Sequence, residues 1–242
     1  MDISLKDIKA FAQKTLLLSG KIAMKYYRKN GVIKTKHDKS IVTIADEEIE
    51  QFIRQHISKN FPKHNIVGEE QGGSIKAGSY NWVIDPIDGT SSFQAGRPVF
   101  TTLLALYKGY TPVLGAIYQP ITNEILLAIE DKIFYNGKKI TPKTKNSKIT
   151  LATTSPELLN KKGKEYFSKL SQSYKNTIYG GDAYNYMLLA LGNIDFIYEQ
   201  GLKPHDFLPL IPILKNANAK FTDIAGKEIK GNYKGLDFIA SR

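Results

Sequence analysis

The sequence predicts an α+β fold in two halves, and three features of the chain support this prediction. Two segments at the start repeat apolar residues every three or four positions, as amphipathic helices do. Short apolar and alternating runs, typical of strands, fill the centre from residue 65 to 130. Strand-like and helical segments then alternate from residue 150 onward. We place the boundary in a polar, basic stretch, so that residues 1–145 form an α+β half and residues 146–242 an α/β half.

The first half is expected to open with two helices. The first begins at Ser4, where Asp7 follows three positions later, as at a capped helix start. The second begins near Ala45 and ends at the sequence Asn60-Phe61-Pro62, because proline cannot continue a helix. Three acids, Asp46, Glu47 and Glu48, fall in its first turn, where the helix dipole favours negative charge.

Short strands are expected next, and the later ones form an antiparallel meander. In the first half they cover 65–68, 82–84, 100–107, 113–119 and 125–130, with one more after the tight-turn pair Asn136-Gly137. The second half is expected to alternate strand 150–153, helix 157–170, helix 183–191, strand 194–199 and helix 206–216, with strands near Phe221 and Phe238.

Composition excludes several classes of protein. The 242 residues contain 42% hydrophobic and 24% charged residues, which is ordinary for a folded domain. Because there is no cysteine, the chain has no disulfide framework, no thiolate–zinc site and no cysteine nucleophile. No run of about 18 apolar residues predicts a membrane span, and the first helix carries lysines where a signal sequence would be apolar. We therefore expect a cytoplasmic protein.

The net charge of +11 raises the question of a nucleic-acid partner. However, the lysines are mostly scattered, and no helix-turn-helix, aromatic RNA-binding or finger motif is present. We therefore expect no specific nucleic-acid partner. A solvated, positive surface also attracts an anionic substrate.

The segment 82–92 carries the sharpest chemical signal. An apolar strand delivers Asp85 and Asp88 into a turn that contains Gly89 and the hydroxyls of Thr90 and Ser91. Two carboxylates on one rigid turn suit Mg²⁺, which prefers hard oxygen ligands and keeps some of its waters. Where a short helix starts after the glycine, the backbone amides of residues 89–91 point at a bound phosphate.

Four further acids stand at the ends of predicted elements. Glu69 and Glu70 follow an apolar run, while Asp46 and Asp206 stand at helix starts. Each of these acids alone is ordinary, because exposed acid pairs and first-turn acids are common. Together with the 82–92 segment they form one set of acidic motifs.

This set resembles the motifs of the inositol monophosphatase superfamily. The matching segments are Asp46 in its Val-Thr-x-x-Asp sequence, Gly68-Glu69-Glu70, Asp85-Pro-Ile-Asp88-Gly-Thr90, and Asp206 before a helix, with Lys36 at the upstream lysine position. The resemblance runs from about residue 36 to 222. It implies the layered α/β/α/β/α sugar-phosphatase fold and Mg²⁺-dependent hydrolysis of a phosphomonoester, with two or three ions in each site.

The resemblance also implies roles for individual residues. Glu69, Asp85 and the carbonyl of Ile87 are expected to bind the first metal ion. Asp85, Asp88 and Asp206 are expected to bind the second. The expected catalytic residues, which orient and deprotonate the attacking water, are Asp46, Thr90 and Glu69. The cations lower the pKa of water and stabilise charge on the leaving oxygen.

Two rival chemistries fit the sequence less well. Aspartyl-phosphate phosphatases use an Asp-x-Asp pair, whereas Asp85 and Asp88 are separated by two residues, one of them Pro86. A zinc hydrolase is disfavoured because the four histidines include no His-Glu-x-x-His type of pair.

Segments 93–100, 114–121, 180–186 and 202–206 resemble the histidinol-phosphate phosphatase branch. In that branch Gly181, Asp182 and Glu199 are implied to contact the substrate, and an acid pair suits a substrate with a cationic amine. One departure is that the glycine pair usual after the last helix reads Ala217-Asn218-Ala219.

Other functions remain open from the sequence. The enzymatic alternatives are an inositol-1-monophosphatase and a 3′(2′),5′-bisphosphate nucleotidase. A non-enzymatic alternative is an RNA- or protein-binding regulator. The resemblance further implies inhibition by Li⁺ and a homodimer.

Overall fold

The computed structural model describes residues 4–29, 33–35, 41–142 and 149–242. Its α-helices are α1 (Leu5–Tyr26), α2 (Ile44–Asn60), α3 (Thr90–Gln94), α4 (Lys161–Ser171), α5 (Asp182–Leu191), α6 (Pro204–Phe207) and α7 (Leu210–Asn216). No helix in these ranges is long and apolar enough to cross a membrane.

The strands form a larger sheet, a smaller sheet and a separate two-stranded pair. The larger sheet follows chain order: β3 (Asn65–Gly68), β4 (Tyr80–Asp88), β5 (Thr101–Lys108), β6 (Thr111–Gln119), β7 (Glu124–Ile129), β8 (Lys132–Tyr135) and β9 (Lys138–Lys139). Only the β3–β4 pair in it is parallel. The smaller sheet runs in spatial order β11 (Asn176–Tyr179), β10 (Thr150–Thr153), β12 (Phe196–Gln200), β14 (Asp237–Ser241) and β13 (Lys220–Thr222). Before α2, β1 (Ile33–Thr35) pairs with β2 (Ile41–Thr43).

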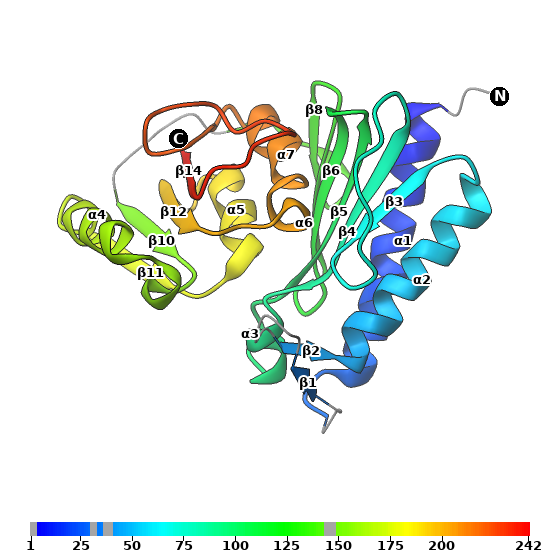
Figure 1. Cartoon of the computed structure of the whole chain (residues 1–242), viewed down its shortest axis with the longest axis horizontal. Coiled ribbons are helices and arrows are strands. Elements are labelled where there is room, and N and C mark those ends of the chain that lie inside the picture. The colour runs from blue at the N-terminus through cyan, green and yellow to red at the C-terminus, as the bar shows by residue number, and fades with distance from the viewer. Residues whose placement is uncertain (1–3, 30–32, 36–40, 143–148) are drawn as a thin grey trace.

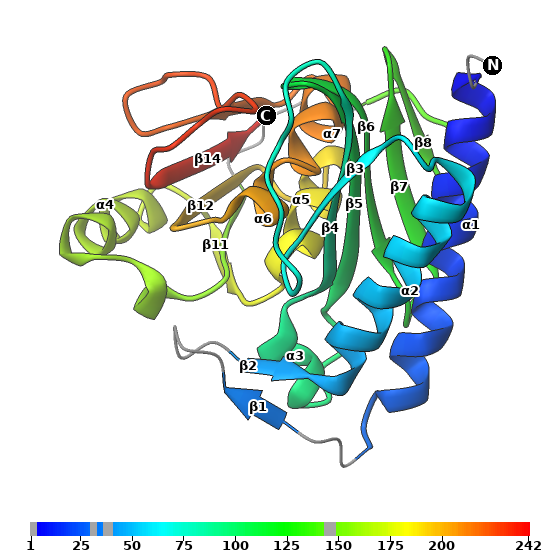
Figure 2. The same cartoon turned by 45° about the vertical axis from the view of Figure 1, so that its right-hand side comes forward.

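The elements stack in five layers, which confirms the predicted α/β/α/β/α fold (Figure 1). Helices α1 and α2 cover one face of the larger sheet, while α5, α6 and α7 lie between the two sheets (Figures 1 and 2). Helix α4 covers the outer face of the smaller sheet (Figure 1). Because alternate side chains of a strand face opposite ways, Trp82 and Ile84 pack beneath the outer helices and Val83 packs toward α5.

The two halves share a hydrophobic core. One cluster of buried side chains joins Val83 and Leu103 of the larger sheet to Met187 of α5 and Phe238 of the smaller sheet. The expected boundary between residues 145 and 146 lies outside the described residues, as does Lys36. We propose the division into halves as a description of sheet membership, since β9 and β10 belong to different sheets.

Several elements differ from the sequence-based expectation. The helix expected over 157–170 is a short 3-10 turn at Pro156–Leu158 followed by α4, because Asn160 caps α4 by accepting from the amide of Gly163 at 2.9 Å. The helix expected over 206–216 is split into α6 and α7 around Pro209, which has no N–H to donate. Strands β1, β2, β8 and β11 were not predicted. At the missing glycine pair, Asn218 adopts a positive φ of 55°, which asparagine tolerates better than most residues.

Candidate metal and phosphate site

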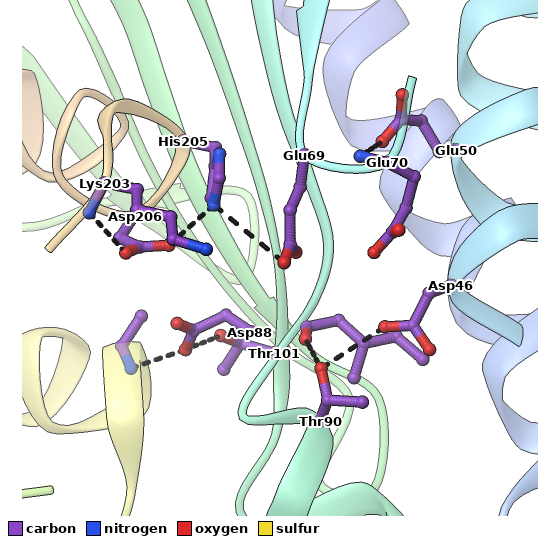
Figure 3. A network of polar contacts seen from close by, with 12 residues as sticks. Asp46, Glu50, Glu69, Glu70, Asp88, Thr90, Thr101, Lys203, His205 and Asp206 are labelled. Atoms are coloured by element: carbon purple, nitrogen blue, oxygen red, sulfur yellow. Dashed lines mark hydrogen bonds and ion pairs between the residues drawn. The ribbon is translucent and has the colours of Figure 1, made fainter. Parts of the chain in front are cut away.

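Five carboxylates meet where several element ends converge between the larger sheet and α6. Asp85 and Asp88 come from the end of β4, Glu69 follows β3, Asp46 lies in the first turn of α2, and Asp206 lies in α6. Figure 3 shows Glu69 in the middle of this group, with Asp206 and Asp88 on one side and Asp46 on the other. All five are sequence-predicted site residues, and the structure brings them together.

A β-bulge explains how the two β4 carboxylates reach one site. Side chains of a regular strand alternate, so residues three apart point to opposite faces. Between Asp85, which faces Leu103, and Asp88, which faces Thr101, the register shifts: three steps on β4 match two on β5. Because of this extra residue in β4, both carboxylates point to the same side of the sheet. Asp85, Asp88 and Asp206 each place an oxygen within 4.8 Å of the other two.

Asp88 is positioned by both halves of the chain. Its Oδ2 accepts a hydrogen bond from the Thr101 hydroxyl at 3.2 Å and from the backbone amide of Ala183 at 2.6 Å. Thr101 belongs to the neighbouring strand, and Ala183 belongs to the first turn of α5. The sequence contains no local signal for either contact.

Glu69 is held in place indirectly, through the buried Glu50 of α2. Glu50 accepts hydrogen bonds from the amides of Glu70 at 2.7 Å and Gln71 at 3.0 Å, and it pairs with Arg54 at 2.8 Å. A Cβ atom on Gly68 would lie 2.2 Å from Glu50, so glycine is needed at this approach. Glu50 thus fixes the chain on both sides of Glu69. Sequence reasoning missed Glu50, although it lies one helical turn after Asp46.

Asp46 faces Thr90 rather than the main carboxylate group. Asp46 closes a capping box, because its Oδ2 accepts from the amide of Thr43 at 2.8 Å. Its other oxygen, Oδ1, lies 3.3 Å from the hydroxyl of Thr90, which also lies 3.0 Å from the carbonyl of Ile87. Burial raises the pKa of Asp46 to about 6. Asp46, Thr90 and Ile87 therefore form one connected group.

Asp206 and its neighbour His205 come from the short helix α6. The Asp206 Oδ2 atom accepts from the amide of Lys203 at 2.7 Å, which caps the helix. His205 Nε2 lies 3.3 Å from Asp206 Oδ1 and 4.0 Å from Glu69 Oε1 (Figure 3). Asp206 is a sequence-predicted site residue, whereas no role was predicted for His205.

The residues present fit a divalent cation. Asp85 is only 2% exposed, and its Oδ1 atom has no hydrogen-bond partner among the described residues. Burial, followed by the charges of Glu69 and Asp88, raises the pKa of Asp85 well above its usual range. Such crowding of carboxylates is costly unless positive charge compensates it. An all-oxygen donor set of this kind suits Mg²⁺ or Mn²⁺.

A cavity of about 340 Å³ adjoins the carboxylates on the side of the smaller sheet. Its lining includes Asp88 and Asp206 together with Asp182 and Glu199. Glu199 is buried and accepts from the amide of Thr154 at 2.7 Å, and burial raises its pKa to about 8. Burial also raises the pKa of Asp182 to about 6. The expected substrate residues therefore lie beside the carboxylate group.

The glycines and the serine of the predicted site occupy the surrounding turns. Gly89 has a positive φ of 86° and begins α3, and a Cβ on it would lie 2.8 Å from Asp182 Oδ2. Thr90 and Ser91 form the first turn of α3, where amide groups have no partner within the helix. Gly181 begins α5 with φ 106°, but a Cβ there would meet Asn185 and not the cavity residues. We therefore expect Gly181 to act through the backbone.

The fold and this site define a class, the metal-dependent phosphomonoester hydrolases. A model described as "Inositol monophosphatase family" matches residues 4–242. The chain belongs to the inositol monophosphatase family, whose members use divalent metals and act on small phosphorylated molecules.

Similar proteins support this placement. Over 215 residues the chain is 44% identical to "Bifunctional phosphatase IMPL2, chloroplastic" of Arabidopsis thaliana, covering 86% of this chain and 62% of that protein. It is 32% identical over 208 residues to a histidinol-phosphatase of Streptomyces coelicolor, covering 81% and 78%. The solved structure of an inositol monophosphatase from Zymomonas mobilis superposes with a TM-score of 0.84 at 34% identity, covering 99% and 94%.

Proposed function

We propose that the protein is a histidinol-phosphate phosphatase that requires Mg²⁺, with two or three ions in each site. The observation that carries this proposal is the pair of acids, Asp182 and Glu199, in the cavity beside the carboxylate group. Two carboxyl groups with raised pKa values suit a substrate that presents a cationic amine, because a positive charge beside them favours their ionised forms. The similarity to a histidinol-phosphatase from Streptomyces coelicolor supports the same substrate class.

The metal ligands follow from the arrangement of donors. Glu69, Asp85 and the Ile87 carbonyl would hold a first cation, and Asp85, Asp88 and Asp206 a second. When bound, such cations lower the pKa of water and neutralise phosphate charge. The orphaned oxygen of Asp85 and the mutual repulsion of these carboxylates support this assignment.

The remaining residues position water and phosphate. The Thr90 hydroxyl has one proton, and when it is donated to Asp46 the hydroxyl lone pairs can accept from a water molecule. Asp46 then serves as the base that takes up the proton lost by the attacking water, with Glu69 nearby. The amides of Gly89, Thr90 and Ser91 bind phosphate oxygens at the start of α3.

The test compares phosphate release, with Mg²⁺, from L-histidinol phosphate, inositol 1-phosphate and adenosine 3′,5′-bisphosphate. Wild type should prefer histidinol phosphate. Glu199→Gln should raise its KM about tenfold or more, because one charge partner of the amine is lost. Its activity on inositol 1-phosphate should change less. Glu165→Gln, an exposed acid on α4, is the matched control and should behave as wild type.

The solved inositol monophosphatase from Zymomonas mobilis gives a second candidate, an inositol-1-monophosphatase. Preference for inositol 1-phosphate that is insensitive to Glu199→Gln would establish it in place of the first. Preference for the bisphosphate would indicate a nucleotidase. If a folded, metal-loaded sample released no phosphate from any ester, the RNA- or protein-binding regulator would replace the enzyme proposal.

Three further properties are proposed, the first two from family membership and the third from the sequence. We propose that Li⁺ inhibits the enzyme, that the chain forms a homodimer, and that it acts in the cytoplasm. Inhibition is tested by adding LiCl to the phosphate-release assay. The oligomeric state is tested by sedimentation equilibrium of the full chain, and the location by fluorescence microscopy of the tagged protein.

A further inference from the structure

We infer that His205 supplies a nitrogen ligand to the cation held by Glu69 and Asp85, so that this site favours Zn²⁺ over Mg²⁺ more than an all-oxygen site does. The inference rests on the proposed metal-dependent function. None of the residue roles implied by the sequence motifs involves this histidine.

The geometry is the first argument. One atom each from Glu69, Asp85 and His205 lies within 4.8 Å of the other two. The separation of His205 Nε2 from Glu69 Oε1 is 4.0 Å. Ligands about 2.1 Å from one ion are about 3 Å apart at right angles and about 4.2 Å apart when opposite. The histidine therefore reaches the same ion as Glu69 with little movement.

The surroundings of His205 are the second argument. Its side chain is only 13% exposed, and Figure 3 shows it directed from α6 toward the space between Asp206 and Glu69. The backbone of α6 is fixed by Pro204 at its start and by the cap that Asp206 forms with Lys203. The buried Oδ1 atom of Asp85, which has no partner among the described residues, adds an independent sign that a ligand belongs here.

The competing interpretation is a histidine that only orients Asp206. In that case Nε2 carries the proton and donates it to Asp206 Oδ1, 3.3 Å away. As a metal ligand, Nε2 is unprotonated and the proton sits on Nδ1. The two interpretations differ in whether a nitrogen atom is bonded to the cation, which spectroscopy detects directly.

The consequence is a change in metal preference. Imidazole suits Zn²⁺ and other transition metals, whereas carboxylate, carbonyl and water suit Mg²⁺ and Mn²⁺. Replacing the ring by an amide should therefore weaken transition-metal binding much more than Mg²⁺ binding. We expect the dissociation constant for Zn²⁺ to rise about tenfold or more in His205→Gln.

The experiment uses the full chain titrated with Mn²⁺ to saturation and studied by pulsed electron paramagnetic resonance. Wild type should show echo modulation from a directly bonded ¹⁴N nucleus, and His205→Gln should lose it. His64→Gln is the matched control: it removes a half-buried histidine that stacks on Phe61 and Tyr80, and it should keep the modulation. Circular dichroism establishes that each variant is folded.

Saturated wild type without ¹⁴N modulation would overturn the inference, as would modulation that persists in His205→Gln. If Mn²⁺ binds without nitrogen and histidinol phosphate is still hydrolysed, the inference fails and the proposed function stands. If the folded wild type binds no Mn²⁺, Zn²⁺ or Mg²⁺, both fail together. Equal loss of Mg²⁺ and Zn²⁺ affinity in His205→Gln, without any nitrogen signal in wild type, would assign His205 to orienting Asp206.

Discussion

The backbone amide of Ala183 donates a hydrogen bond to Asp88 Oδ2 at 2.6 Å, across 95 positions of sequence. Asp88 ends β4 in the larger sheet, and Ala183 begins α5 in the layer between the sheets. This contact places the acid-lined cavity of the second half directly beside the carboxylates of the first half. Under the proposed function, the docking of α5 therefore positions both a metal ligand and the substrate cavity.

Asp88→Asn should abolish Mg²⁺-dependent phosphate release without unfolding the protein. The asparagine carbonyl can still accept from Ala183, but the ligand loses its charge. Because a bound cation contributes several kcal/mol of charge stabilisation, we expect kcat/KM to fall about a hundredfold or more. Phosphate release is the measurement, and circular dichroism the control. Retention of half the wild-type rate would refute the role of Asp88.

Mg²⁺ should raise the melting temperature, because it binds the folded carboxylate group and has no such site in the unfolded chain. At a concentration of 100 Kd, one site contributes about 2.7 kcal/mol. Asp85→Asn should melt higher than wild type in EDTA, since burial and neighbouring charges disfavour the ionised Asp85. It should also respond less to Mg²⁺. Differential scanning calorimetry of both proteins, with and without EDTA, tests this; an equal Mg²⁺ response in both would contradict it.

Glu50→Ala should lower both stability and activity, although Glu50 is not a proposed ligand. It removes the carboxylate partner of the half-buried Arg54 and leaves the amides of Glu70 and Gln71 without their acceptor. Breaking such a pair costs about 3 kcal/mol. Urea unfolding measures the loss, and metal titration measures the displacement of Glu69. The exposed Glu47→Ala on the same helix is the control, and a loss of the same size there would show that the effect is not specific to Glu50.

Thr90→Val should lose activity and keep its affinity for metal. Valine has nearly the shape of threonine but cannot donate to Asp46 or accept from water. General acid–base assistance contributes about 10²–10⁴-fold, so kcat should fall by that factor. Thr90→Ser should recover most of the rate. Calorimetric Mg²⁺ titrations of both variants distinguish lost chemistry from a lost site, and an inactive serine variant would argue against the hydroxyl.

Glu199 should make the metal-free protein less stable as pH rises. Its pKa rises from 4.5 in the unfolded chain to about 8 in the folded protein, because burial disfavours the ionised form. Between these values the unfolded state has lost the proton that the folded state still holds, so stability falls with pH. Above about pH 8 the penalty is constant.

Glu199→Gln removes this dependence. Its melting temperature relative to wild type should increase from pH 4.5 to about pH 8 and then level off. Thermal unfolding in EDTA across this range is the measurement, with Glu165→Gln as the control that keeps the wild-type profile. Parallel profiles for wild type and Glu199→Gln would show that Glu199 ionises normally.

Local sequence was sufficient for the elements and residues that depend on near neighbours. The cap at Ser4 and the turn at Asn136-Gly137 involve residues within a few positions of one another, so composition and spacing predict them. The carboxylate set was also found from sequence, through its resemblance to the motifs of the inositol monophosphatase family. The split of the last helix around Pro209 was missed, since proline at such a place permits either a kink or a break.

The sequence by itself determined the set of carboxylates and the order, along the chain, of the helices and strands that build the layers. Tertiary structure alone decided how these carboxylates meet. A β-bulge turns Asp85 and Asp88 to the same side, and the amide of Ala183 donates a hydrogen bond to Asp88. It also decided that Glu50 supports the loop around Glu69 and that His205 faces Glu69. The physical reason is that strand register and helix docking depend on packing between distant segments, which local propensity does not encode.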